Sequence, residues 1–422
     1  MIKKIKLSLI YGCVFLFVGC GGGGSDSNST AQPQEPLEDF SFPLHDISNP
    51  IVGDLKDYTL EDVNVRLTDN IAQRKILTYK MLGVTGQVTN ATAIVFIPTK
   101  QAPVSGYKTV VWAHGTTGVA DICAPSSQGL AVNAIPLINR LLDEGYVVIA
   151  PDYEGLGTAG SHPFLNLKSE AFSITDAVVA AHQYLKQQDL FVSKEWLTIG
   201  HSQGGQAALG VSQYHTRAKL DYRGSIAIAP ASNLYEILNK EKEKASRSSD
   251  DLEKLEIYGT INGFAALGIA GMQGYNNGVS FADVINPNLV STARRAETDC
   301  LPTLSSNLGF EIGLFNLLSS NVENAVGLKS NFIQIPVFKK FLERDSQPLR
   351  VKVDTPVIIY QGSADTTVPK YATDLLVSNA TRLGTFIDYR TDENKTTKWN
   401  HSTIMNQSDV FYADIQKLMP SN

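Results

Sequence analysis

Cysteine and histidine are scarce in this chain of 422 residues, which contains four of the first and seven of the second. No two histidines stand in the H-E-x-x-H pattern, and no group of cysteines and histidines has the spacing of a zinc site. Basic runs are missing beyond the N-terminus, and the net charge is −6. A nucleic-acid surface needs the opposite charge. The sequence therefore predicts no metal, no cofactor and no nucleic-acid partner.

The stretch 7–19 is apolar but too short to span a bilayer comfortably, and a lysine-rich start precedes it. It ends in Phe17-Val18-Gly19-Cys20, which resembles the lipobox of bacterial lipoproteins, where the cysteine is lipidated. A plain export signal that happens to end in Gly-Cys is the alternative. We expect a signal peptide over 1–19, then lipidated Cys20 and a flexible tether over 20–50. This pattern predicts an exported protein anchored by lipid in the bacterial cell envelope, in the outer membrane.

Two cysteines remain once the export signal is removed and Cys20 is lipidated. They are Cys123 and Cys300. An exported chain is in an oxidising compartment, and two cysteines allow one pairing. The sequence therefore predicts a disulfide between Cys123 and Cys300.

Short apolar segments alternate with helical patterns over most of the remaining chain. Strands are expected at 76–81, 92–97, 109–113, 146–150, 196–200, 225–230, 356–361 and 384–389, and helices at 129–144, 169–188 and 370–383. This alternation predicts an α/β fold, with a mostly parallel central sheet and helices on both of its faces. The expected domain covers 51–422.

One turn in this pattern has chemistry of its own. The segment 196–200 is an apolar strand, and Gly200-His-Ser202-Gln-Gly204 then leads into an amphipathic helix. G-x-S-x-G between a strand and a helix is the nucleophile elbow, in which a tight turn projects the serine hydroxyl clear of the sheet. The alternative is a surface turn with a helix-capping serine. We interpret Ser202 as a nucleophile.

A serine nucleophile needs a base and an orienting carboxylate, which follow it in the chain order Ser, acid, His. Asp365 directly follows the expected strand 356–361, and His401 is the only histidine after residue 215. Separately, a turn-forming aspartate and a loop histidine are common. Their order and placement together predict that Asp365 orients His401, and that His401 is the base.

The tetrahedral intermediate of such a reaction needs two N–H donors, which form the oxyanion hole. The backbone N–H of Gln203 supplies one, because this residue begins the helix after the nucleophile. The loop His114-Gly115-Thr116 follows a core strand and is expected to supply the other. The sequence does not distinguish Gly115 from Thr116 as the donor. We interpret His114 and His201 as positioning residues.

The alternation breaks between 231 and 345, where helical and Gly/Asn-rich pieces replace strands. This segment is inserted after the elbow, on the side of the sheet where ligands bind. We expect an inserted, mainly helical cap. Its small and aromatic side chains, in 263–271, 310–318 and 332–338, are expected to line an apolar acyl pocket. An ordinary helical packing domain is the alternative.

Several of these motifs together resemble the secretory lipase family of α/β-hydrolases. They are Cys123-Ala-Pro-Ser126, Pro151-Asp-Tyr-Glu-Gly155, Gly200-His-Ser-Gln-Gly-Gly205, the long cap, and the Asp365/His401 pair. The loop 114–117 departs from the Tyr-Asp type of the fungal members. The resemblance implies hydrolysis of a carboxylic ester, with a small-molecule ester or lipid as substrate. A peptidase or acyltransferase on the same scaffold, or a catalytically idle lipoprotein that binds apolar ligands, remains an alternative.

Overall fold

The computed structural model describes residues 51–54, 67–276, 278–318 and 326–421. The predicted signal peptide, Cys20 and the whole of the predicted tether lie outside these residues. No helix within the described ranges is long and apolar enough to cross a membrane.

The described strands form one nine-stranded sheet, in the order β1-β2-β3-β5-β4-β6-β7-β8-β9. Antiparallel pairs join β1 to β2, β2 to β3, and β3 to β5, while every pair from β5 to β9 is parallel. The prediction of a mostly parallel sheet is confirmed. The strands are β1 (Ile51–Asp54), β2 (Ile71–Leu82), β3 (Val88–Pro98), β4 (Tyr107–Ala113), β5 (Val147–Pro151), β6 (Val192–His201), β7 (Asp221–Ile228), β8 (Val357–Gln361) and β9 (Ile387–Thr391).

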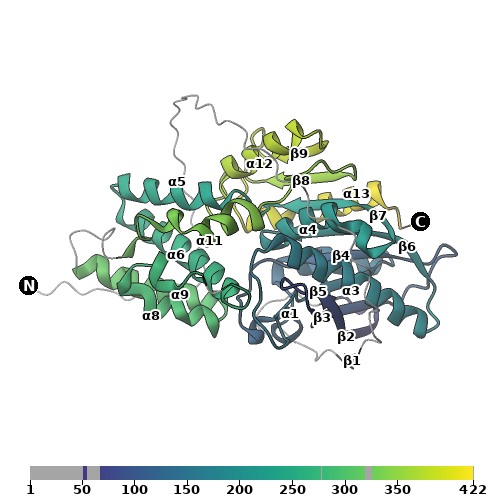
Figure 1. Cartoon of the computed structure of the whole chain (residues 1–422). Helices are drawn as coiled ribbons and strands as arrows, with labels where there is room; N and C mark the ends of the chain where they lie inside the picture. Colours follow the sequence, from purple (N-terminus) through teal and green to yellow (C-terminus); the bar gives the residue numbers. More distant parts are fainter. Residues whose placement is uncertain (1–50, 55–66, 277, 319–325, 422) are drawn as a thin grey trace, which may run out of the picture. The chain divides into compact units, whose positions relative to one another are not determined.

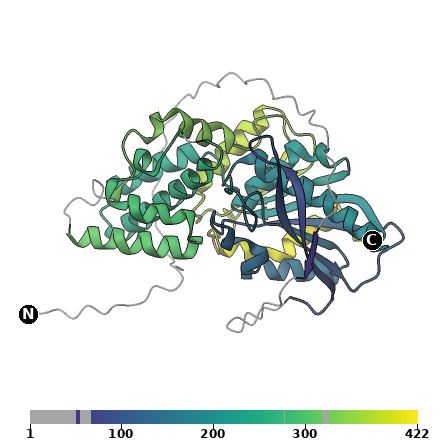
Figure 2. The same cartoon turned by 60° about the horizontal axis from the view of Figure 1, so that its bottom comes forward.

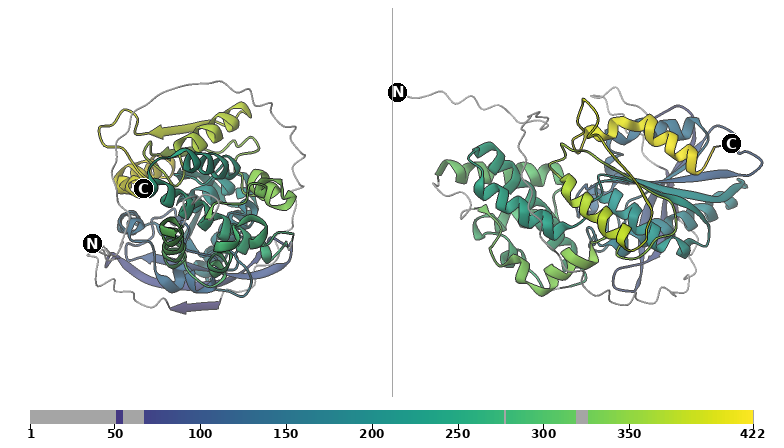
Figure 3. Two further views of the ribbon diagram at one scale, coloured as in Figure 1. Left: turned by 90° about the vertical axis from the view of Figure 1, so that its left-hand side faces the viewer. Right: turned by 90° about the horizontal axis from the view of Figure 1, so that it is seen from above.

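Helices cover both faces of the sheet, as predicted (Figure 1; Figure 3). On one face, α2 (Ile135–Asp143) and α13 (Ser408–Leu418) share a hydrophobic core with the central strands. On the other face lie α3 (Leu167–Gln187), α4 (Gln203–Tyr214) and α12 (Lys370–Arg382). This two-sided burial explains why the central strands carry consecutive apolar residues: in β4, Val110 and Trp112 face the first core, and Val111 faces the second.

The segment between β7 and β8 is helical, and its described residues contain no strand. It has its own hydrophobic core, which is separate from the two cores of the sheet. Figure 2 shows these helices gathered beside the sheet. They are α5 (Leu234–Arg247), α6 (Asp251–Gln273), α7 (Phe281–Val284), α8 (Val290–Ala293), α9 (Leu301–Leu318), α11 (Pro336–Lys340) and the π-helical turn η7 (Phe341–Asp345).

Most element boundaries agree with the sequence prediction to within a few residues, but the helix expected over 129–144 begins late. The short α1 (Pro125–Gln128) ends before this range, a 3₁₀ turn covers Val132–Ala134, and α2 starts only at Ile135. The break lies at Gly129, whose φ of 89° is not helical. The stop at Gly145 is correct, because this glycine has a φ of 91° directly after the helix.

Candidate active site

Ser202 lies at the tip of the turn between β6 and α4, with φ 59° and ψ −118°. A residue other than glycine rarely adopts this backbone conformation, so the turn is strained. Two glycines make it possible. A Cβ on Gly200 would lie 2.2 Å from the carbonyl oxygen of Gly204, and one on Gly204 would lie 1.9 Å from that of Ala113. The elbow therefore packs against β4 so closely that neither position has room for a side chain.

The structure brings Ser202 together with the two residues that the chain order predicts as its partners. His401 Nε2 lies 2.9 Å from Ser202 Oγ, and His401 Nδ1 lies 2.8 Å from Asp365 Oδ2. The serine and the aspartate are buried, and the histidine is partly exposed. This is the geometry of a nucleophile, a base and an orienting acid.

The carboxylate of Asp365 is fixed on both of its oxygens. Oδ1 accepts the backbone N–H groups of Thr367 and Val368, each at 2.9 Å. Oδ2 faces His401, and it also lies 3.3 Å from Nε2 of Gln361, a buried residue at the end of β8. Two N–H donors on Oδ1 leave Oδ2 as the oxygen that accepts the hydrogen bond from the Nδ1–H of His401. Sequence reasoning missed Gln361, because no local pattern links it to Asp365.

His201, next to the nucleophile, supports the loop that carries the base. Its Nε2 lies 2.8 Å from the backbone carbonyl oxygen of His401. A carbonyl only accepts, so Nε2 carries the hydrogen. Burial, and to a lesser extent the charge of His401, lower the pKa of His201 to about 3. The ring is therefore neutral at physiological pH and acts as a positioning residue.

The loop predicted to complete the oxyanion hole lies beside the nucleophile. Thr116 and Ser202 line the same pocket, and a Cβ on Gly115 would lie 3.7 Å from Ser202 Cβ. His114 holds this loop, because its Nδ1 is 2.7 Å from the Gly115 carbonyl oxygen. The His114 ring stacks on Tyr153, and the Tyr153 hydroxyl donates to the backbone carbonyl of His114 at 3.0 Å. Burial lowers the pKa of His114 to about 4, so this support is uncharged.

Gln203, predicted to give the other donor, is the first residue of α4, so its N–H has no partner within the helix. Two buried side chains, Glu170 and His162, contact the side chain of Gln203. Nε2 donates to Glu170 Oε1 at 2.7 Å and lies 2.9 Å from Nε2 of His162. Burial raises the pKa of Glu170 to about 8, so the group is predominantly protonated at neutral pH. Neither Glu170 nor His162 carries a sequence signal that links it to the elbow.

The predicted disulfide between Cys123 and Cys300 is present, with a Cα–Cα distance of 5.4 Å. It joins the chain just after the loop 114–118 to the residue just before α9. Beside it, the Leu301 N–H donates to the Thr117 carbonyl oxygen at 2.8 Å. Gly118 packs so tightly there that a Cβ would lie 2.7 Å from Cys123 Sγ. The chain that follows the loop 114–118 and the inserted helices are thus covalently connected.

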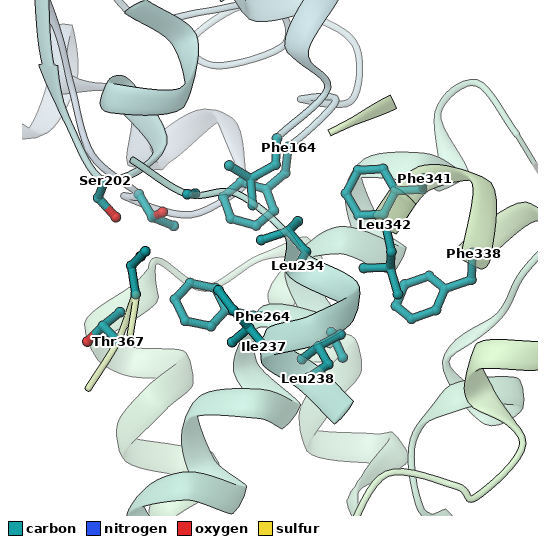
Figure 4. Close-up of a pocket in the computed structure, with 15 residues that line it drawn as sticks. Phe164, Ser202, Leu234, Ile237, Leu238, Phe264, Phe338, Phe341, Leu342 and Thr367 are labelled. Atoms are coloured by element: carbon teal, nitrogen blue, oxygen red, sulfur yellow. The ribbon is translucent and has the colours of Figure 1, made fainter. Parts of the chain in front are cut away.

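A pocket extends from Ser202 between the sheet and the inserted helices. Figure 4 shows Ser202 and Thr367 at one end and Phe338 and Phe341 at the other, with Phe264 between them. No ionisable side chain is among its lining residues, which also include Thr116, Phe164, Leu165, Ala231, Leu234, Ile237, Leu238, Ala265, Leu342 and Val368. The space inside, including its opening to solvent, is about 560 Å³.

Of the three cap segments expected to line this pocket, two contribute and one does not. Residues 263–271 provide Phe264 and Ala265, and residues 332–338 provide Phe338. The segment 310–318 provides none of the lining residues, so this part of the prediction is wrong. It lies on α9, whose buried face packs in the core of the inserted helices and not at the pocket.

A mostly parallel sheet with a serine at a strand–helix elbow, and an acid and a histidine on later loops, defines the α/β-hydrolase class. The profile of the secretory lipase family matches residues 127–246. Secreted triacylglycerol lipase LIP3 of Malassezia restricta is 25% identical over 236 residues, which are 55% of this chain and 45% of that protein. This chain is therefore similar to the secretory lipases over part of its length, and the resemblance predicted from its motifs is confirmed. Its match spans less than half the length of the Malassezia protein.

Two solved structures show the same fold. The rice cell wall degrading esterase LipA from Xanthomonas oryzae, in a ligand-bound form, superposes with a TM-score of 0.61 at 20% identity, over 82% of this chain and 89% of the esterase. Candida antarctica lipase A in its closed state gives a TM-score of 0.57 at 17% identity, over 80% of this chain and 78% of the lipase. At these identities the comparisons establish the α/β-hydrolase fold.

Proposed function

We propose that this protein hydrolyses carboxylic esters with an apolar acyl group. One observation carries the proposal: Ser202, hydrogen-bonded to His401 and through it to Asp365, opens directly into a pocket without ionisable side chains. An apolar pocket is suited to a hydrocarbon chain. It offers no carboxylate to a free amine, which disfavours a peptidase.

The reaction follows from these positions. The oxygen of Ser202 attacks the ester carbonyl carbon, while His401 Nε2 takes the hydroxyl proton and Asp365 stabilises the imidazolium. The negative charge on the carbonyl oxygen is stabilised by the N–H of Gln203 and a donor from Gly115 or Thr116. Collapse breaks the bond to the alcohol, which leaves with the proton from His401. Water, deprotonated by His401, then attacks the acyl-enzyme and releases the acid and free Ser202.

Turnover of nitrophenyl esters with acyl chains from two to sixteen carbons tests this proposal. The wild-type protein is expected to release nitrophenol, and Ser202→Ala is expected to lose this activity by several orders of magnitude. A Ser232→Ala variant is the matched control, because Ser232 is also buried but is not among the pocket-lining residues. Equal turnover by wild type and Ser202→Ala would contradict the proposal. No turnover, with binding of apolar ligands, would favour the idle binding protein.

The pocket also makes a test for the acyl group possible. Ala265 is buried on the pocket wall, and Ala265→Leu adds three carbon atoms to that wall. We expect lower kcat/KM for esters of twelve or more carbons and little change for acetate esters, measured on the same series. An equal loss for all chain lengths would show that the acyl chain lies elsewhere.

The predicted lipid anchor at Cys20, the signal peptide over 1–19 and the cap function of 231–345 belong to the same proposal. Export is supported by the family and by the secreted relative. Anchoring is supported by the lipobox-like tetrapeptide alone. Mass spectrometry of the N-terminus of the protein from the cell envelope is expected to find acyl chains on Cys20, and an unmodified N-terminus would contradict this.

A further inference from the structure

Helix α9 (Leu301–Leu318) is apolar on two opposite sides. One side packs in the core of the inserted helices through Leu304, Leu308 and Ile312, which are fully buried. The opposite side carries large apolar side chains that face solvent over its last three turns. Their exposed fractions are 74% for Phe310, 44% for Leu314, 78% for Leu317 and 76% for Leu318.

These four residues follow helical spacing at i, i+4, i+7 and i+8, so they form one continuous stripe, here called the outer face of α9. A helix in water normally has polar residues on the side away from the core. This helix has a single ionisable residue, Glu311, among its 18 residues. Among the described residues, the other exposed large apolar side chains lie one to an element or loop; they are Val88, Val104, Ile122, Phe191, Leu252, Phe386 and Val410. Within the described ranges, the outer face of α9 is therefore the one place where such side chains gather on one element.

We propose that the outer face of α9 docks on the surface of a lipid bilayer. Leucine and phenylalanine side chains insert favourably among the acyl chains of a bilayer. Because α9 contains no lysine or arginine, its outer face offers no positive charge to an acidic partner. In Figure 2 this helix lies at the outer edge of the group of inserted helices. The segment 310–318 contributes nothing to the pocket, so acyl binding does not account for its apolar character.

The number of residues between the predicted anchor at Cys20 and the described domain is consistent with a bilayer as the docking surface. If Cys20 carries lipid, only 30 residues, 21–50, separate the anchor from the described domain. Any unstructured chain of this length has a root-mean-square span of about 30 Å, so the anchor keeps the domain near the bilayer. Some face of the domain then meets the membrane repeatedly. The Cys123–Cys300 disulfide and the hydrogen bond from the Leu301 N–H to the Thr117 carbonyl oxygen connect the start of α9 to the chain beside Thr116, so docking through α9 also constrains the position of this pocket-lining loop relative to the membrane.

Depth-dependent quenching tests the proposal directly. Tryptophan is introduced as Leu317→Trp in one full-length variant and as Phe386→Trp in another, since Phe386 is 81% exposed on a loop before β9. Each is added to vesicles of phosphatidylethanolamine and phosphatidylglycerol with brominated acyl chains. The extra fluorescence from Leu317→Trp is expected to fall by about twofold or more on binding, and that from Phe386→Trp is expected to stay unchanged.

A charged pair provides the complementary test. Phe310→Trp is the probe, and it is compared with and without the added pair Leu317→Asp and Leu318→Asp. The pair is expected to abolish quenching of this indole by the brominated lipid. Thermal stability and turnover of a soluble acetate ester are expected to stay at the wild-type level. The proposal would be overturned if only the Phe386→Trp indole were quenched, or if neither Leu317→Trp nor Phe386→Trp were quenched. Concentration-dependent dimerisation that the aspartate pair abolishes would also overturn it, because the occupant would then be a second copy of the chain.

The readout is separate from the proposed ester hydrolysis. Quenching is measured without any turnover, and it is expected to be the same when Ser202→Ala is added. An inactive protein with quenched Leu317→Trp would contradict the hydrolase and leave the membrane surface standing. An active protein without quenching would do the reverse.

Discussion

Asp365→Asn isolates the role of the acid in the proposed mechanism, because the structure fixes which way the new amide must point. The backbone N–H groups of Thr367 and Val368 both donate to Oδ1 at 2.9 Å. An NH₂ group placed there would face two donors. The amide oxygen therefore occupies the Oδ1 position, and the NH₂ group points at Nδ1 of His401.

An NH₂ group can only donate, so it makes His401 accept on Nδ1 and keep its hydrogen on Nε2. In this tautomer Nε2 faces the Ser202 hydroxyl, 2.9 Å away, with no lone pair to take the proton. We expect kcat/KM to fall about 10⁴-fold, which corresponds to about 5.5 kcal/mol of transition-state stabilisation. The fold is expected to persist, because the substitution preserves shape.

Initial rates on a short nitrophenyl ester measure the loss, and thermal unfolding followed by circular dichroism checks the fold. Asp374→Asn is the matched control, since Asp374 is a carboxylate on α12 that contacts Lys370 and Tyr389 and not the triad. It is expected to retain near wild-type rates. A loss of less than about tenfold in a folded Asp365→Asn protein would refute the proposed role of this residue.

Three further outcomes follow from the packing and electrostatics around the site. Gly204→Ala places a Cβ 1.9 Å from a β4 carbonyl oxygen and is expected to lower the free energy of unfolding by about 3 kcal/mol or more, measured in urea; a wild-type midpoint would contradict the close packing. Replacing Cys123 and Cys300 by serine opens a loop of 177 residues and is expected to cost about 5 kcal/mol, seen as a lower Tm; an unchanged Tm would show that the bond adds no stability. The pKa of Glu170, raised by burial to about 8, lies above its unfolded value, so its contribution to stability is full below pH of about 4.5 and is lost as pH rises through 8. Glu170→Gln is therefore expected to flatten the decline in stability between pH 5 and 8.5, and an unchanged decline would assign it to other groups.

The sheet and the elbow could be predicted from sequence because their signals are local. A strand buried on both faces has consecutive apolar residues, as in 110–113, and the elbow needs glycine at 200 and 204 for steric reasons that hold in every such turn. The order of Ser202, Asp365 and His401 follows from the class of fold. The Cys123–Cys300 pairing followed from counting.

The residues that support the site depend on tertiary contacts and have no such signal. Gln361 meets Asp365 only because the chain turns back after β8. Glu170 and Gln203 are 33 residues apart and meet between α3 and the start of α4. The segment 310–318 was misplaced for a related reason: it is apolar on two opposite sides, and composition alone does not tell a pocket wall from an exposed face.

Covalent labelling is the most direct test of the central claim that Ser202 is an activated nucleophile. The folded protein is treated with a serine-directed organophosphonate, digested, and examined by mass spectrometry. We predict one stoichiometric adduct on the peptide that contains Ser202, and its loss after prior unfolding or in His401→Ala, because the hydroxyl is activated only by the base 2.9 Å away. An adduct on another residue, or none on Ser202 in the folded protein, would contradict the account.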